Sequence, residues 1–502
     1  MPIGSKPVRT GFCEIKGGYG LTIKESMQRI IRPYHSIFRT KSIQDLHECC
    51  ASEHSLKKVL GRFELVLFGI GAIIGTGIFV ITGVAAANYA GPALVVSFII
   101  AGVVCFFAAL CYSEFAAMVP IAGSAYSYCY ASLGEIWAWI IGWDLILEYS
   151  VSVSAVAVGW SGYVTSLLAD IGVILPASLV NPPGFNNGIV NLPAMIIIAL
   201  ITLLLIVGAR QSAMVNNIIV VVKVGIILLF LYLGYSHVNP VNWSDFMPFG
   251  WSGVLTGAAI VFFAYIGFDA VSTTAEEVKN PQKDLPFGIL VSLLICTILY
   301  IAVAAVLTGI VSYSTLNTPA PVSFALEELG IHWGAALVSV GALLGITSVI
   351  LVLLFGQSRI FFAMSRDGLL PAVFRQVHPK FRTPVRVTIF VGVVTALIAG
   401  FLPLQEIAQL VNVGTLAAFI IVAAGVIMLR HTRPDLTRPF KCPFVPVVPL
   451  LCMFSCAYLI YVLPTLTHLR FVIWLIIGLA VYFVYSAKHS RMAIARETGT
   501  KD

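Results

Sequence analysis

The chain has 502 residues, of which 59% are hydrophobic and 11% are charged, and its mean hydropathy is +0.95. This composition excludes a soluble globular domain, and its repeated apolar runs of about 20 residues are typical of transmembrane helices. The net charge of +7 fits basic tails and loops that face an anionic membrane surface, so nucleic-acid binding is not expected. The sequence therefore predicts an all-α membrane protein.

Twelve apolar segments are long enough to be predicted as transmembrane spans. They cover residues 63–90, 92–119, 136–168, 191–208, 213–236, 251–277, 286–310, 331–365, 386–402, 405–430, 446–465 and 470–487. With the N-terminus inside, every Lys and Arg except Lys223 and Arg470 lies in a cytoplasmic tail or loop or toward the cytoplasmic end of a span, as the positive-inside rule requires. Both termini are therefore predicted to be cytoplasmic, and the protein is expected in the cell membrane.

The predicted spans divide the chain into regions. Residues 1–62 form a cytoplasmic tail that lacks the apolar stretch of a cleaved signal peptide. Residues 63–430 form the core in two halves, 63–236 and 251–430, and they are followed by two additional spans in 446–487 and a cytoplasmic tail, 488–502. The ten cysteines avoid the predicted outer loops, and no two histidines lie together inside the spans. We expect no disulfide scaffold, metal, cofactor or catalytic site.

The first span is unusually rich in glycine. The segment FGIGAIIGTGIFVITG, Phe68 to Gly83, contains five glycines, and each costs about 1 kcal/mol relative to Ala inside a helix. Close packing against another helix is one explanation. The other is that the helix unwinds near residues 75–77, where free amides can hold an anionic group.

The sixth span favours the second explanation. The segment AIVFFAYIGFDAVSTTAEEV, Ala259 to Val278, has its own central Gly267, followed by Asp269. An Asp just after a break is typical of a helix N-cap, which satisfies the first free amides of a new half-helix. Glycine-interrupted spans at corresponding positions of two halves indicate a transporter binding site.

The two interrupted spans are five apart, and five is odd. The second set of five spans must then enter the membrane with the opposite orientation, which gives a five-plus-five inverted repeat with two extra spans. In such a site the free N–H groups of one break bind a carboxylate, and free carbonyl groups bind an ammonium. An α-amino acid carries both groups on one carbon.

Lys223, in the run NNIIVVVKVGIILLFLYLG (216–234), is the only Lys or Arg in the interior of a predicted span, since Arg359, Arg386, Arg430 and Arg470 lie toward the ends of theirs. A charge at a helix centre costs roughly 2.5 to 3.5 kcal/mol, so such residues usually face a polar cavity or a partner and serve transport. Glu148 in the third span lies at a comparable depth, since each helical residue rises about 1.5 Å. It is a candidate partner of Lys223 or a second proton site.

Three long motifs are GIGAIIGTGIF (69–79), FFAYIGFDAVSTTAEEVKNPQKDLP (262–286) and FGQSRIFFAMSRDGLLP (355–371). They resemble the cationic amino acid transporter branch of the amino acid, polyamine and organocation superfamily, and the resemblance covers about residues 55–487. It implies a leucine-transporter-like fold in which spans one and six are broken. It also implies which residues bind substrate.

By this resemblance, the substrate carboxylate meets the amides of Gly75, Thr76 and Gly77, and the ammonium meets the carbonyls of Ile73, Phe263, Ala264 and Ile266. Phe268 is similar to an aromatic gate over the substrate; without the motif it would be an ordinary apolar Phe.

In sodium-driven relatives with this fold, a cation links span one to span eight, and the corresponding positions here are Gly71, Ile74, Thr347 and Ser348. The ammonium of Lys223 would replace that ion, and its protonation would replace sodium binding, because burial disfavours the charged form. The alternative is a permanently charged Lys223 in a structural ion pair.

The combined hypothesis is a proton-coupled importer of L-amino acids. Span eight contains GITSVILVLLFG (345–356), which has no acid. The family resemblance implies that Leu353 lies near the substrate side chain, so small neutral amino acids such as alanine are favoured over cationic ones. A transporter of cationic amino acids, an amino acid or polyamine exchanger, and an amino acid sensor that signals through the N-terminal tail are the alternatives. The expected partners are the amino acid, protons and the lipid bilayer; an accessory membrane subunit is left open.

Overall fold

The computed structural model describes residue 40 and residues 60–120, 123–207, 213–378, 383–492 and 494. In these ranges the fold is helical, and the one extended pairing is a parallel bridge between Leu60 and Val278. Most of the predicted tail 1–62 and the end of the tail 488–502 lie outside the described residues.

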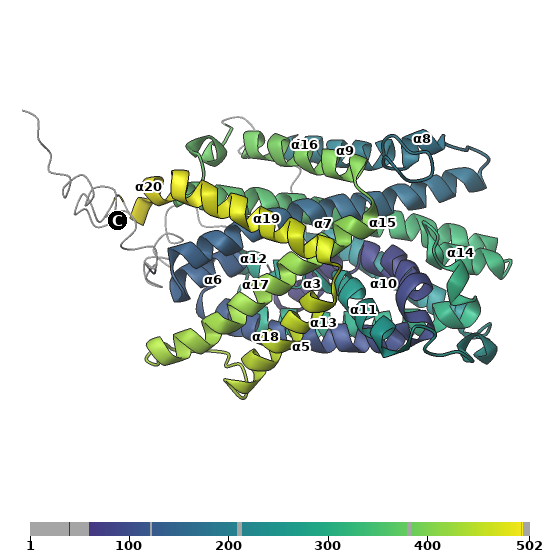
Figure 1. Cartoon of the computed structure of the whole chain (residues 1–502), viewed down its shortest axis with the longest axis horizontal. Helices are drawn as coiled ribbons and strands as arrows, with labels where there is room; N and C mark the ends of the chain where they lie inside the picture. Colours follow the sequence, from purple (N-terminus) through teal and green to yellow (C-terminus); the bar gives the residue numbers. More distant parts are fainter. Residues whose placement is uncertain are drawn as a thin grey trace, which may run out of the picture.

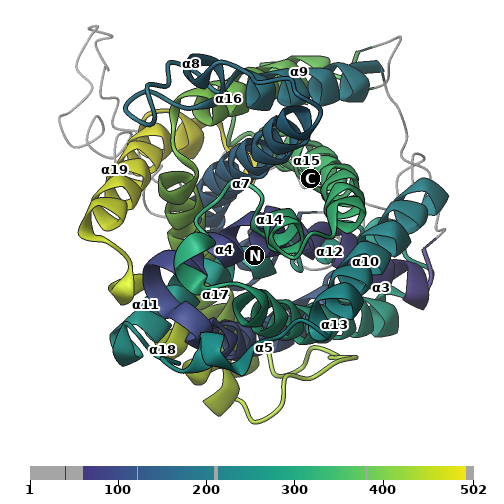
Figure 2. The same ribbon diagram turned by 90° about the vertical axis from the view of Figure 1, so that its right-hand side faces the viewer.

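The helices form a bundle whose long members run side by side (Figure 1). They are α3 (Arg62–Ile73), η2 (Gly77–Ile81), α4 (Thr82–Ala85), α5 (Leu94–Met118), α6 (Ser124–Ser132), α7 (Glu135–Asp170), α9 (Leu192–Val207), α10 (Ala213–Tyr235), α11 (Gly250–Val261), η6 (Phe262–Tyr265), α12 (Ala270–Thr273), α13 (Pro281–Ile310), α14 (Pro321–Glu328), α15 (His332–Arg366), η9 (Ala372–Arg375), α16 (Val385–Phe401), α17 (Leu404–Thr432), α18 (Val447–Val462), α19 (Thr465–Val481), η10 (Tyr482–Ser486) and α20 (Ala487–His489). Figure 2 shows α5, α7, α10, α13, α15 and α17 around a centre in which α4 and α12 lie, with α9, α16 and α19 outside.

Within the described residues, eight helical segments are long and apolar enough to cross a membrane. Three further apolar helices, α9, α16 and α18, have 16 or 17 residues. At about 1.5 Å per residue they are slightly shorter than the hydrocarbon core of a bilayer. One of the eight segments, Gly77–Met118, joins the second half of the predicted first span to the second span, which is one reason why this number is smaller than twelve.

The first and sixth predicted spans are both interrupted in the structure. Helix α3 ends at Ile73, Ile74 is extended, and η2 begins at Gly77. In the sixth span, α11 continues into the tight turn η6, Ile266 is extended, and α12 begins at Ala270. Asp269 occupies the N-cap position of α12, but its side chain makes no capping hydrogen bond. The predicted capping role of this carboxylate is therefore wrong.

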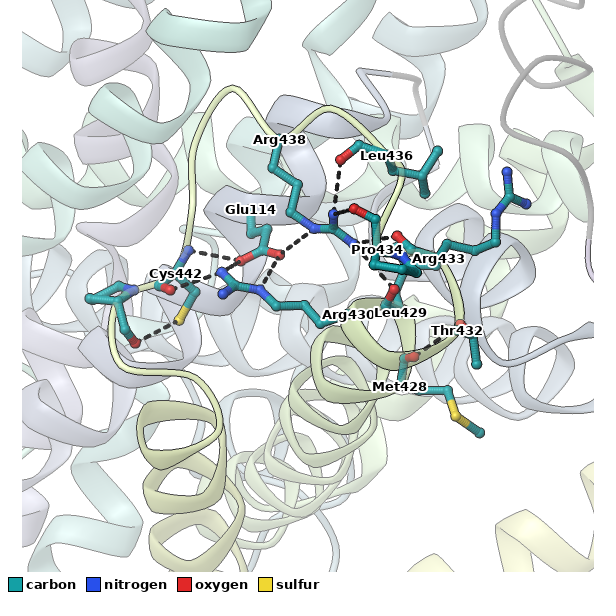
Figure 3. Close-up of polar contacts among 11 residues, drawn as sticks. Glu114, Met428, Leu429, Arg430, Thr432, Arg433, Pro434, Leu436, Arg438 and Cys442 are labelled. Carbon is teal, nitrogen blue, oxygen red and sulfur yellow. Dashed lines mark hydrogen bonds and ion pairs between the residues drawn. The ribbon is translucent and has the colours of Figure 1, made fainter.

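A buried carboxylate joins the last spans to the core (Figure 3). Glu114 on α5 accepts hydrogen bonds from Arg430 Nε at 3.1 Å, Arg430 Nη2 at 2.7 Å and the Cys442 amide at 2.8 Å. Arg438 Nε lies 3.3 Å from the same carboxylate. The guanidinium of Arg438 also donates to four carbonyls of the loop, those of Leu429, Arg433, Pro434 and Leu436. Glu114 thereby fixes the loop between α17 and α18 against α5.

Replacing this carboxylate should destabilise the fold. Glu114→Gln keeps the shape but leaves Arg438, whose side chain is 7% exposed, without its counter-charge. Because breaking one side of a buried ion pair is strongly unfavourable, we expect the free energy of unfolding to fall by about 3 kcal/mol. Thermal unfolding of the purified protein in detergent measures this. Arg433→Gln, which removes an exposed ion pair with Asp435, is the matched control and should change little. Equal melting temperatures for both variants would contradict the assignment.

Candidate functional site

The breaks of the first and sixth spans lie against each other. A Cβ atom at Gly77 would overlap the Cα of Ala264, and one at Gly267 would lie 2.8 Å from the Ala72 carbonyl oxygen. The glycines therefore serve close packing and unwinding together, so the two explanations of the glycine-rich first span do not exclude each other. The contact brings the free backbone groups of both breaks to one place in the bundle centre.

The first break offers backbone amides. In the described residues, the N–H groups of Gly75 and Thr76 donate no backbone hydrogen bond. Gly77 is the first residue of η2, where an amide has no partner within its own helix. The Thr76 hydroxyl is turned away and donates to the Val156 carbonyl at 3.2 Å. What this segment presents is backbone N–H groups at a helix N-terminus, an arrangement that favours an anion.

The carbonyls at the breaks are partly occupied by a tyrosine that the sequence analysis did not identify. Tyr300 Oη on α13 lies 3.0 Å from the Ile73 carbonyl oxygen and 2.8 Å from the Ala264 carbonyl oxygen. A tyrosine hydroxyl has one proton, so it can donate fully to only one of them at a time. The Phe263 carbonyl accepts from the Ile266 amide at 3.3 Å. Tyr300 thus bridges both breaks and leaves acceptor capacity for another donor.

Phe268 is fully buried beside the second break. Its ring packs edge-on against Tyr112, with centroids 5.9 Å apart, and against Phe419 at 5.2 Å. Next to it, Asp269 accepts a hydrogen bond from Tyr149 Oη at 3.4 Å. The residue predicted as an aromatic gate therefore belongs to an aromatic cluster formed by α5, α17 and the sixth span.

Lys223 reaches the first break from α10. Its Nζ donates to the carbonyl oxygens of Gly71 at 2.7 Å and Ile74 at 2.9 Å, and the side chain is fully buried. These carbonyls lie at the C-terminal end of α3, where free acceptors and the helix dipole both favour a cation. A Cβ atom at Gly345 of α15 would lie 2.9 Å from Lys223 Cγ, so α15 packs directly on the lysine stem.

The two predicted hydroxyl contacts of Lys223 have other partners. Thr347 Oγ1 donates to the Leu343 carbonyl and accepts from Trp160 Nε1, both within 3.0 Å. Ser348 Oγ donates to the Gly345 carbonyl at 2.8 Å. Among the described residues, the hydrogen bonds of the Lys223 ammonium are those to α3.

Glu148 is buried on α7, but no ion pair joins it to Lys223 in the described part of the chain. It lies near Asp144 and Asp269 instead, close enough for the charges of the three carboxyl groups to interact. The comparable depth of Glu148 and Lys223 was not sufficient for contact, because depth does not fix the direction in which a helix face points. No three His, Cys, Asp or Glu side chains of the described residues are grouped so that they could hold a metal ion.

Leu353 lies on the face of α15 that is turned toward the breaks. Val349, one turn earlier, would contact a Cβ atom at Gly75 at 3.3 Å, and a Cβ atom at Gly356 would lie 3.0 Å from the ring of Tyr149. Residues four and seven positions apart share one helix face, so Leu353 is placed between these two contacts. Its side chain is buried.

One sequence signal would have revealed Tyr300. Tyr300 places a hydroxyl group within an otherwise apolar span, and a buried tyrosine hydroxyl usually has a hydrogen-bond partner. The same argument that singled out Lys223 applies to it. Phe419 gave no such signal, because its side chain has no polar group that would need a partner.

Comparisons with known proteins agree with this geometry. The amino acid permease family model matches residues 60–489. The branched-chain amino acid permease BcaP of Bacillus subtilis (strain 168) is 53% identical over 461 residues, which cover 91% of this chain and 99% of that protein. The methylthioribose transporter of the same organism is 54% identical over 456 residues, with the same coverage. The vacuolar cationic amino acid transporter 4 of Arabidopsis thaliana is 41% identical over 409 residues, covering 80% of this chain and 68% of that protein.

The matched region contains both breaks and the helices that surround them. The resemblance inferred from the three motifs is confirmed, and a permease is a transport protein and not an enzyme. Together with the apolar helices, these similarities make the protein a multi-pass membrane protein. The chain belongs to the amino acid permease family.

Proposed function

We propose that this chain is a proton-coupled transporter that imports L-amino acids through the cell membrane by alternating access. In this proposal it crosses the membrane twelve times, spans one to five and six to ten form an inverted repeat, and both termini are cytoplasmic. The observation that carries the proposal is the pair of hydrogen bonds from Lys223 Nζ to the carbonyls of Gly71 and Ile74.

The backbone of the two breaks supports binding of a zwitterion. Free amides at residues 75–77 would hold the carboxylate, and the carbonyls around Ile73 and Ile266 would hold the ammonium. Tyr300 supports this assignment, because its single proton leaves one of two neighbouring carbonyls available to an additional donor. Phe268 would close over the bound molecule.

Lys223 supports coupling to protons. A charged ammonium makes stronger hydrogen bonds to carbonyls than a neutral amine does. Loss of its proton would weaken the contact between α10 and the first break, which also carries the carboxylate site. Protonation of this one side chain would thereby alter the shape of the substrate site, without any bound sodium ion.

A neutral substrate fits the buried leucine and valine face of α15. The curated relatives include one named for branched-chain amino acids, one for methylthioribose and one for cationic amino acids. We favour small or branched neutral amino acids, beginning with alanine and valine. The second candidate is a cationic amino acid. The carboxyl groups of Asp144, Glu148 and Asp269 favour it, because Glu148 lies near the other two, Asp269 directly follows Phe268, and carboxylates would attract a second positive charge.

Removing the lysine should separate accumulation from binding. In sealed vesicles with an inward proton gradient, Lys223→Ala should abolish accumulation of labelled alanine. Binding of alanine should remain detectable by thermal shift, because backbone groups hold the zwitterion. Replacing sodium by potassium should leave wild-type uptake unchanged. Wild-type uptake that requires sodium and ignores the proton gradient would overturn the coupling proposal.

The first break should tolerate no side chain at Gly77. Gly77→Ala would force η2 away from Ala264, so we expect substrate affinity to fall at least about tenfold, a loss of about 1.4 kcal/mol. Gly75→Ala is the matched control, because its Cβ meets only the flexible side chain of Val349 at 3.3 Å, and it should be milder. Thermal shift with alanine and with alanine amide measures both. Strong binding of the amide would place the carboxylate site elsewhere.

Leu353 should limit the length of the substrate side chain. Leu353→Ser adds room and a hydroxyl, so arginine should gain the ability to compete with labelled alanine, at some loss for small apolar substrates. Competition curves for wild type and variant measure this, and Leu344→Ser, an exposed position on the same helix, is the control. Potent inhibition of the wild type by arginine would favour the cationic candidate.

A further inference from the structure

Helix α6 is a short helix that connects α5 to α7. All nine of its residues are buried, although it lies outside the predicted spans. The glycines at its two ends, Gly123 and Gly134, have φ values of +156° and +101°, which L-residues with side chains rarely adopt. These two glycines give α6 two positions about which it can turn as a unit.

The aromatic cluster around Phe268 continues into α6. Tyr128 of α6 stacks on Phe115, with ring centroids 5.2 Å apart and planes 8° apart. It also packs edge-on against Tyr112, which in turn packs against Phe268. Ser272 on the second half of the sixth span donates a hydrogen bond to Ser124 of α6 at 3.1 Å. Helix α6 therefore covers the proposed substrate gate on the side where α5 ends and α7 begins.

The C-terminal segment 482–491 is joined to α6 by hydrogen bonds to a shared carboxylate. Glu135, the first residue of α7, is fully buried and accepts hydrogen bonds from three hydroxyls. They are Tyr130 Oη of α6 at 2.9 Å, Tyr482 Oη at 3.0 Å and Ser490 Oγ at 2.5 Å. One carboxylate thus binds α6 and the C-terminal segment together.

The same segment contacts the turn that follows α15. Ser486 Oγ donates to the Leu369 carbonyl at 2.6 Å, and the Arg491 amide donates to the Asp367 carbonyl at 3.1 Å. The carboxylate of Asp367 accepts a hydrogen bond from Tyr126 of α6 at 2.8 Å. The C-terminal segment and this turn therefore hold α6 at two tyrosines.

The hydroxyl groups of Tyr126 and Tyr130 remain protonated and can therefore donate hydrogen bonds. Burial, and then the carboxylate of Asp367, raise the pKa of Tyr126. Burial, and then the carboxylate of Glu135, raise the pKa of Tyr130. Each hydroxyl therefore keeps its proton at neutral pH and remains a donor to its carboxylate.

We propose that α6 is an inner gate beneath Phe268, and that residues 482–491 form a latch that holds this gate closed through Glu135 and Asp367. This inference rests on the proposed transport function. In the transport cycle α6 would turn about its two glycines, separate Ser124 from Ser272 and open the path from the site. The hydrogen bonds of residues 482–491 would determine how often α6 opens.

A reversible crosslink between α6 and the sixth span tests the gate. Ser124→Cys with Ser272→Cys places two thiols where two hydroxyls now touch, and mild oxidation with copper phenanthroline should join them. The oxidised protein should still show a thermal shift with alanine but should lose uptake in vesicles, and dithiothreitol should restore it. Each single variant, treated with the same oxidant, is the control for the native cysteines.

Two results would overturn the gate. Undiminished uptake by the crosslinked protein would show that α6 does not need to leave the sixth span. Failure of the two thiols to join would show that the two elements are not in contact in the membrane. If the untreated wild-type protein neither binds nor takes up alanine, the proposed function is refuted, and not the gate. Crosslinking followed by mass spectrometry would still report whether α6 contacts the sixth span in that case.

The latch is tested with a mild variant of the C-terminal segment. Ser490→Ala removes a hydrogen bond to Glu135, so α6 should open more readily and uptake at saturating alanine should rise several-fold, with unchanged affinity. Ser455→Ala is the matched control, because this serine donates only within α18. Uptake by Ser490→Ala that equals or falls below that of the control, at equal amounts of folded protein, would refute the latch.

Discussion

The structure depends on how unpaired backbone groups are satisfied inside a bilayer. Water is not available there, so each free N–H or carbonyl group must find a partner within the protein or a bound molecule. The breaks at residues 74–76 and 266–269 create such groups at the centre of the bundle. Lys223 and Tyr300, which belong to two different helices, supply the donors that make these breaks tolerable. In the proposed transporter, the substrate binds where this supply is incomplete.

The sequence was most informative where a residue is out of place in its surroundings. Glycines in an apolar helix indicated the two breaks, and one lysine in an apolar span indicated a polar contact at its end. Both inferences need only the cost of a residue in a membrane helix. Asp269 shows the limit of local reasoning: it stands at an N-cap position, yet its carboxylate accepts from Tyr149 of a helix far away in the chain. Spacing within one segment cannot reveal such a partner.

The polar contacts at the end of the bundle show the same limit. Arg62 pairs with Asp284, Arg359 pairs with Glu277, and Leu60 pairs its backbone with Val278. Together they connect the start of α3 and the helix α15 to the end of the sixth span and the start of α13. From the sequence these charges are indistinguishable from solvated loop charges, because their partners lie on other helices. The arrangement of Glu114 between two arginines was equally invisible, although it attaches the last two spans to the core.

The contact between Gly345 and the stem of Lys223 has a mechanical consequence. Helix α15 packs against the methylene groups of Lys223, and the carbonyls at the end of α3 accept hydrogen bonds from its ammonium. The side chain is therefore held in one extended conformation by contacts along its length and at its end. In the proposed mechanism, a change in the attraction at its ammonium would therefore displace α3 relative to α10 and α15 instead of producing a new side-chain conformation. The bundle would thereby convert the gain or loss of a single proton into movement of whole helices.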